Sequence, residues 1–146
     1  MRRHLLQTLL ASAAAALLPA LTTTPAQAQE ARKPARVVVQ VSEADPARWN
    51  LVLNNVANLQ EDLGAANVTI EIVAYGPGLG MLKFDAPTNS RVSEAVKAGV
   101  AVLACENTMR NQKVARADMH PGVTYVAAGV TQIVKRQQEG WAYLRP

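Results

Sequence analysis

The sequence predicts an α/β domain in which a mostly parallel sheet of about five strands is sandwiched by helices. Apolar, β-branched segments alternate along the chain with segments of helical periodicity, and the crossovers between successive strands are short. The segment from Val100 to Ala104 is continuously apolar rather than alternating, which is typical of a strand covered on both faces. These observations predict the fold class but not the order of the strands.

Five strands are expected, at residues 36–41, 68–74, 100–104, 123–127 and 141–144. The first helix begins at Asp45-Pro46, which has the order of a capping residue followed by proline. Trp49, Leu53 and Val56 then recur at helical spacing, and Gly64 ends the helix. Further helices are expected at residues 91–98, 108–115 and 130–139.

Residues 1–28 have the pattern of an export signal. Arg2-Arg3 form a positive start, a Leu- and Ala-rich stretch follows, and Ala26-Gln27-Ala28 supplies a small-x-small cleavage pattern. Pro19 breaks the apolar stretch, which argues against a permanent membrane anchor. The arginine pair also resembles the twin-arginine export motif, so both this route and the general secretory route stay open. We expect the mature chain to begin at Gln29 in the periplasm.

Removing 28 of the 146 residues leaves 118, a length suited to one compact domain at residues 36–146 behind a flexible leader at 29–35. The loss of two arginines lowers the formal net charge from +4 to +2. With few aromatic residues and no long basic tract, the mature chain is not expected to bind nucleic acid or a membrane. The single cysteine excludes an intrachain disulfide, so a thiol in an oxidising compartment needs burial, a partner or a reductant.

That cysteine, Cys105, directly follows the apolar strand and precedes residues suited to opening a helix. In open α/β sheets, reactive groups gather at the carboxyl edge of the strands, where Cys105 would lie. The first amides of the following helix, near Asn107 and Thr108, can lower a thiol pKa and favour the thiolate, whereas the adjacent Glu106 opposes this. The alternative is that Cys105 is simply a small buried apolar residue.

Two other features would lie near this edge. Gly76-Pro77-Gly78 follows the second strand, and its glycines permit close backbone approach, although an ordinary tight turn is the alternative. It lacks the spacing of a dinucleotide or phosphate loop. Asn54, Asn55 and Asn58 lie within five positions of the first helix, although asparagine is a mediocre helix former. They either face water or bind a loop or a ligand.

His120 is the only histidine outside the export signal, so a site with several histidine ligands for a metal is excluded. Its pairing with Cys105 as a nucleophile and base would need hydrogen-bond proximity that the sequence does not show. We expect no metal and no cofactor.

Several ordered blocks carry a resemblance to a known family. They are Trp49 with Leu53-Asn54-Asn55 and Asn58-Leu59, Val73–Gly78, Gly99-Val100 with Ala104–Met109, and Gln138–Pro146. Together they resemble the DsrE/DsrF-like family of small sulfur-handling proteins over residues 37–146. The resemblance implies a three-layer α/β/α domain that forms homo- or hetero-oligomers, often trimers or hexamers. Its best-understood members carry sulfur as a persulfide on a cysteine, and Cys105 matches that position in an exported branch.

The resemblance therefore implies that the Cys105 thiolate accepts a sulfane sulfur and passes it to an acceptor thiol. The donor and acceptor would be proteins or small sulfur compounds. The other residues expected at this site are Asn54, Asn58, Gly76, Pro77, Gly78, Asn107 and Thr108. The competing hypothesis is a non-catalytic small-molecule-binding or oligomeric assembly module in which Cys105 is only packed.

A homo-oligomer, a trimer or hexamer rather than a dimer, is expected chiefly from the resemblance. Met81, Leu82 and Phe84 add to it because they are apolar where a loop should be polar. Such residues commonly mark an interface when they are exposed.

Overall fold

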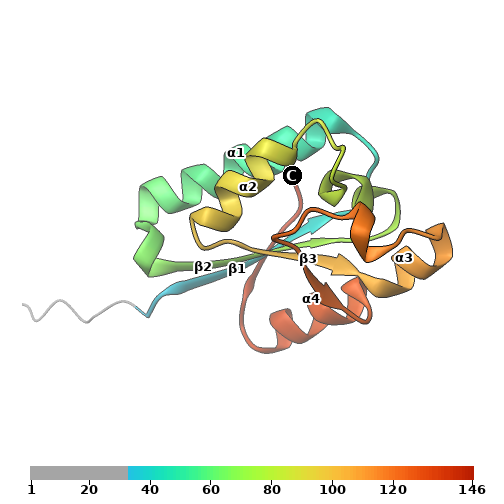
Figure 1. Cartoon of the computed structure of the whole chain (residues 1–146). Helices are drawn as coiled ribbons and strands as arrows, with labels where there is room; N and C mark the ends of the chain where they lie inside the picture. The colour runs from blue at the N-terminus through green and yellow to red at the C-terminus, as the bar shows by residue number, and fades with distance from the viewer. Residues whose placement is uncertain (1–32) are drawn as a thin grey trace, which may run out of the picture. The chain divides into compact units, whose positions relative to one another are not determined.

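The structure, a computed structural model, describes residues 33–146; the expected export signal and most of the expected leader lie outside these residues. Five parallel strands form one sheet in the order β4-β3-β2-β1-β5 (Figure 1). The strands are β1 (Ala35–Val41), β2 (Val68–Ala74), β3 (Ala101–Cys105), β4 (Thr124–Val126) and β5 (Ala142–Leu144). The expected α/β fold with a parallel sheet is confirmed.

Four α-helices connect these strands, together with three short 3₁₀ helices. The α-helices are α1 (Pro46–Leu63), α2 (Asn89–Lys97), α3 (Glu106–Gln112) and α4 (Gly129–Gln138), and the 3₁₀ helices are η1 (Ala65–Asn67), η2 (Gly76–Leu82) and η3 (Arg116–Asp118). The Asp45 carboxylate accepts a hydrogen bond from the Ala47 amide at 2.9 Å, as expected for the cap of α1. Helix α3 begins two residues earlier than expected, because Cys105 itself has the extended backbone of a helix N-cap.

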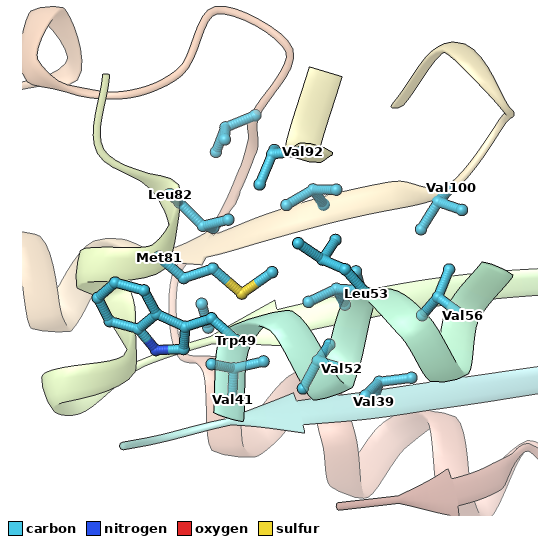
Figure 2. Packing of buried hydrophobic residues seen from close by; sticks show 14 of the residues in the cluster. Val39, Val41, Trp49, Val52, Leu53, Val56, Met81, Leu82, Val92 and Val100 are labelled. Atoms are coloured by element: carbon cyan, nitrogen blue, oxygen red, sulfur yellow. The ribbon is translucent and has the colours of Figure 1, made fainter. Parts of the chain in front are cut away.

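Helices α1 and α2 cover one face of the sheet and enclose the larger apolar core (Figure 1). Val39 and Val41 from β1 meet Leu53 and Val56 from α1 in this core, as Figure 2 shows. Met109 of α3 belongs to the same cluster, so α3 lies on the α1 side of the sheet.

The expectation that Met81, Leu82 and Phe84 are exposed is wrong for the first two. Met81 and Leu82 are fully buried in the larger core, and Figure 2 shows both beside the α1 residues. They belong to η2, which folds back over the end of the sheet because Gly78 packs against the Val41 carbonyl group. Only Phe84 is exposed, at 65%.

Helix α4 covers the opposite face over a smaller core that consists of Val38, Val73, Leu103, Ile133 and Trp141. Glu71 of β2 is buried at the centre of this face and accepts hydrogen bonds from Arg136 and Gln132 of α4. The Arg136 guanidinium also lies 4.6 Å from the centre of the Trp141 ring. The ion pair between Glu71 and Arg136 and the stacking of Arg136 on Trp141 therefore hold α4 against the sheet.

The chain leaves two neighbouring strands, β3 and β4, towards opposite faces of the sheet. The chain leaves β3 into α3 on the α1 side, whereas it leaves β4 into α4 on the other side. In open α/β sheets, a crevice forms at the carboxyl ends of two strands whose connections diverge in this way. In this chain that place lies between Cys105 at the end of β3 and Gly129 at the start of α4.

Candidate functional site

Cys105 is the last residue of β3, at the carboxyl edge of the sheet, as the sequence predicts. Leu103, two residues earlier in the strand, packs under α4, and Cys105 faces the same side. The residue is buried, with 5% of its surface exposed. The thiol therefore lies between the starts of α3 and α4.

Gly129, the first residue of α4, lies directly over this thiol. A Cβ atom at Gly129 would lie 3.3 Å from the Cβ of Cys105 and 3.1 Å from the Cβ of Tyr75. Only glycine lets the start of α4 approach these two side chains without displacement. The backbone amide of Gly129 hydrogen-bonds to the Cys105 sulfur, so a second helix N-terminus contributes positive potential at the thiol.

The surroundings of the thiol shift its acidity in two opposed ways. Burial raises the pKa of the Cys105 thiol, because it penalises the charged form. The Thr108 hydroxyl and then the amides of Gly129, Thr108 and Asn107 hydrogen-bond to the sulfur and lower this pKa. The hydrogen bonds outweigh the burial, so the pKa of Cys105 lies below its ordinary value.

Thr108 connects the thiol to the glycine loop. Its side chain is buried, and its hydroxyl oxygen accepts a hydrogen bond from the Gly76 amide at 2.9 Å. The Thr108 hydroxyl proton then remains for the Cys105 sulfur. Gln112 of α3 donates to the Gly76 carbonyl at 3.0 Å, which ties the loop to the same helix. The sequence prediction that Gly76 and Thr108 lie near Cys105 agrees with these contacts.

The rest of the glycine loop has a structural explanation. Gly76 has a φ of +54°, which favours glycine. A Cβ at Gly78 would lie 2.3 Å from the Val41 carbonyl oxygen, so this position admits no side chain. Pro77 is exposed at the beginning of η2.

Asn107 contributes to the site through its backbone rather than its side chain. Its amide is shared between the Cys105 sulfur and the Ala127 carbonyl oxygen, which lies at 3.2 Å. Its exposed side chain accepts a hydrogen bond from Arg110, one turn along α3. The neighbouring Glu106 carboxylate pairs with Arg116, so a countercharge offsets the negative group beside the thiol.

Asn54 and Asn58 do not join Cys105. Both are exposed on α1, which covers the opposite face of the sheet from the thiol. The Asn54 side-chain oxygen accepts a hydrogen bond from Arg91 of α2 at 2.7 Å. Asn54 therefore joins two helices, and the expected role of either asparagine in orienting a donor at Cys105 has no support in this geometry.

His120 does not pair with Cys105 either. The Gly122 amide donates to its Nδ1 atom at 2.9 Å, so the ring proton is on Nε2. Nε2 then donates to the Ser93 hydroxyl oxygen at 2.7 Å, and Ser93 donates to the Asn89 carbonyl at 3.1 Å. In this tautomer, His120 cannot accept the Ser93 proton, which excludes a serine–histidine nucleophile as well.

Two hollows of about 360 and 480 Å³ lie beside α3 and share Lys113 and Val114 in their walls. Cys105 lines neither of them. Within residues 33–146, no group of His, Cys, Asp or Glu side chains is arranged to hold a metal ion. In the same part of the chain, none of the helices combines the length and apolarity needed to cross a membrane.

Two neighbours of the thiol, Gly129 and Tyr75, are not among the site residues expected from the sequence. Gly129 follows Ala127-Ala128, and three small residues at the start of a helix are the sequence signal of such a close approach. Tyr75 directly precedes the glycine loop, within the block Val73–Gly78.

The sequence and the fold were compared with those of known proteins. A family model described as the DsrE/DsrF-like family matches residues 35–146. A protein of unknown function from Methanobacterium thermoautotrophicum, MTH1491, is 44% identical, with a TM-score of 0.74 over 77% of this chain and 99% of its own. No curated protein matches the chain.

Two more distant structures share the fold alone. BT1422 from Bacteroides thetaiotaomicron, a conserved protein of unknown function, is 15% identical with a TM-score of 0.61 over 76% of this chain and 94% of its own. The ychN protein from E. coli is 12% identical with a TM-score of 0.60 over 77% of this chain and 99% of its own.

Proposed function

The chain belongs to the DsrE/DsrF-like family, and from this premise we propose that it binds sulfane sulfur as a persulfide on Cys105. The observation that supports this proposal most directly is the position of the thiol between two helix starts. Amides from α3 and α4 and the Thr108 hydroxyl all hydrogen-bond to the sulfur, and the pKa of Cys105 lies below its ordinary value despite burial.

The same surroundings suit both the thiolate and its persulfide. The Cys105 thiolate attacks the outer sulfur of a donor persulfide, forming a new S–S bond while the donor thiolate leaves with its electron pair. The bound sulfur is negatively charged near neutral pH, and the amides of Gly129 and Thr108 stabilise that charge. An acceptor thiolate then attacks the outer sulfur, and Cys105 leaves as the thiolate from which the cycle began.

The size of the donor follows from burial. Cys105 is 5% exposed, and Tyr75 and Gly129 lie against it. A small compound, such as an inorganic polysulfide or a small organic persulfide, reaches such a thiol more readily than the active-site loop of a protein donor does. The proposal therefore favours a small donor and a small or flexible acceptor.

Location and assembly extend the proposal. Residues 1–28 have the pattern of an export signal, so the sulfur binding would take place in the periplasm. The family resemblance favours a homo-oligomeric trimer or hexamer. N-terminal sequencing of the exported protein should find Gln29 first, and light scattering should find an assembly larger than a dimer.

Intact mass spectrometry tests the central claim. The folded protein, incubated with inorganic polysulfide, should gain the mass of one sulfur atom, and a reductant should remove it. Cys105→Ser should gain none while it keeps the fold, because the substitution hardly changes the side-chain volume. Absence of the adduct in the wild-type protein contradicts the proposal.

The burial of Cys105 favours a second candidate, in which the cysteine is only packed and the chain is a non-catalytic binding or assembly module. A thiol probe separates the two candidates. A packed thiol reacts with iodoacetamide only at the rate at which the protein opens, whereas a thiol beside helix amides reacts rapidly near neutral pH.

A further inference from the structure

A tight turn directly after η2 presents Phe84 to solvent. Phe84 is the only phenylalanine of the chain and, with 65% of its surface exposed, the most exposed large apolar side chain among residues 33–146. The Ala86 amide donates to the Lys83 carbonyl at 3.1 Å, which closes a turn with Phe84 and Asp85 at its corner. Asp85 is exposed as well. Phe84 and Asp85 together are called the tip.

The backbone beneath the tip is fixed to the rest of the domain. The Phe84 amide donates to the Asp118 carbonyl at 2.9 Å. Leu82 and Ala86, which flank the turn on its two sides, are buried. A side chain that stands on a fixed backbone loses little conformational entropy when it is bound, so the tip is suited to insertion into a partner.

The hollow of about 360 Å³ beside α3 has an apolar wall and a basic rim, and it is called the α3 hollow. The apolar side chains of the wall are Met109, Val114 and Ala115, and the cations of the rim are Arg110, Lys113 and Arg116. The Glu106 carboxylate also lines the hollow and pairs with Arg116. Among residues 33–146, no carboxylate forms an ion pair with Arg110 or Lys113. The α3 hollow therefore suits an apolar group that has a carboxylate beside it.

The tip has this composition and lies next to the α3 hollow without filling it. Phe84 and Asp85 line the second hollow, of about 480 Å³, but not the α3 hollow. The two hollows share Lys113 and Val114, so a projection and a matching depression lie side by side on one face of the molecule. A two-fold contact needs this arrangement, because the same patch must supply both halves of the fit in each copy.

We propose that this face is a two-fold contact between two copies of the chain. Phe84 of each copy enters the α3 hollow of the other and packs against Met109 and Val114. Asp85 then lies at the basic rim and pairs with Arg110. The opposite charges of the tip and the rim favour a second copy over a cationic partner, which the rim would repel.

Such a contact doubles whatever assembly the chain otherwise forms. A two-fold contact is closed, so it turns a monomer into a dimer, and a trimer built on other surfaces into a hexamer. Because Cys105 lines neither hollow, the contact does not depend on sulfur binding. Failure of the contact and failure of the proposed function are therefore separate results.

Sedimentation velocity of the protein over a range of concentrations tests the contact. Truncating a buried aromatic anchor typically weakens binding roughly 30-fold, and each contact loses two anchors, so Phe84→Ser should weaken the association by about 10³-fold. At micromolar concentration the variant should then have half the mass of the wild-type assembly. Leu63→Ser is the matched control and should keep the wild-type mass. Leu63 is 41% exposed, lies at the end of α1 just before β2 begins, and lines neither hollow.

A charge exchange tests the pairing of the tip with the rim. Asp85→Arg and Arg110→Asp should each halve the mass, because like charges then meet, and the double variant should restore it. Asp85 and Arg110 line different hollows of one chain, so this rescue reports a contact between copies. Equal masses for the wild type and Phe84→Ser, or a double variant that stays as small as the single ones, overturn the two-fold contact.

Discussion

Replacing Thr108 by valine tests how much of the acidity of Cys105 comes from one hydroxyl group. The substitution keeps the shape of the buried side chain but removes the donor to the sulfur and the acceptor of the Gly76 amide. A hydrogen bond to a charged group is worth about 1.5–3 kcal/mol, and one pKa unit corresponds to about 1.4 kcal/mol. The pKa of Cys105 should therefore rise by about one to two units.

The lost acceptor also affects folding. The Gly76 amide would be left without its partner in a partly buried loop, which costs about 1–3 kcal/mol of unfolding free energy. Thr108→Ser is the matched control, because it keeps the hydroxyl and loses only a methyl group. It should leave the pKa of Cys105 almost unchanged.

The assay is the rate of iodoacetamide alkylation as a function of pH, measured on protein that circular dichroism shows to be folded. The inflection of the rate reports the pKa of Cys105, since the thiolate is the reacting form. At a pH below the pKa of both proteins, Thr108→Val should react about 10- to 100-fold more slowly than wild type, because there each pKa unit changes the thiolate fraction about tenfold. The reasoning fails if both proteins share one inflection, or if Thr108→Ser shifts it as far as Thr108→Val.

Replacing Glu71 by alanine removes the buried carboxylate that pairs with Arg136 and leaves Arg136 only its exposed partner, Glu139. The free energy of unfolding should fall by roughly 2–3 kcal/mol, discounted because Arg136 is partly exposed, and a wild-type midpoint in urea denaturation would contradict this. Gly78→Ala places a Cβ 2.3 Å from the Val41 carbonyl oxygen and should cost about 1–3 kcal/mol or more, a loss absent if the thermal midpoint is unchanged. Folding lowers the pKa of Cys105, so the free energy of unfolding of the wild type should increase relative to that of Cys105→Ser as the pH rises through the folded-state pKa towards about 8.5. This added stability should be lost as the pH falls through the folded-state pKa. Parallel profiles of unfolding free energy against pH would refute this.

Much of the fold was predictable because it depends on local patterns. Each of the five expected strands lies within one residue of its observed bounds, and α1 extends from Pro46 to Leu63 as its cap and glycine stop predict. Local pattern failed at Met81 and Leu82, which look like exposed loop residues in the sequence. Their burial depends on how η2 folds back over the sheet, and no short-range signal reports that.

The candidate site was predictable only in part. The position of Cys105 at a strand end, and the nearness of Thr108 and Gly76, follow from the parallel sheet. The predicted role of Asn54 at Cys105 rested only on its being polar. Asn54 lies on α1, which covers the face of the sheet opposite to α4 and the thiol. The face that a helix covers depends on the path of the whole chain.

By itself, the sequence determined the alternation of strands and helices, the parallel sheet and the place of its single thiol at the carboxyl edge. It did so because hydrophobic periodicity and capping are local properties of the chain. Only the tertiary structure decided that α4 returns across the opposite face and brings Gly129 and Tyr75 against Cys105. The acidity of the thiol depends in part on the contact with Gly129. Hydrogen bonds and helix dipoles act over a few ångströms in space, however far apart the residues lie in the chain.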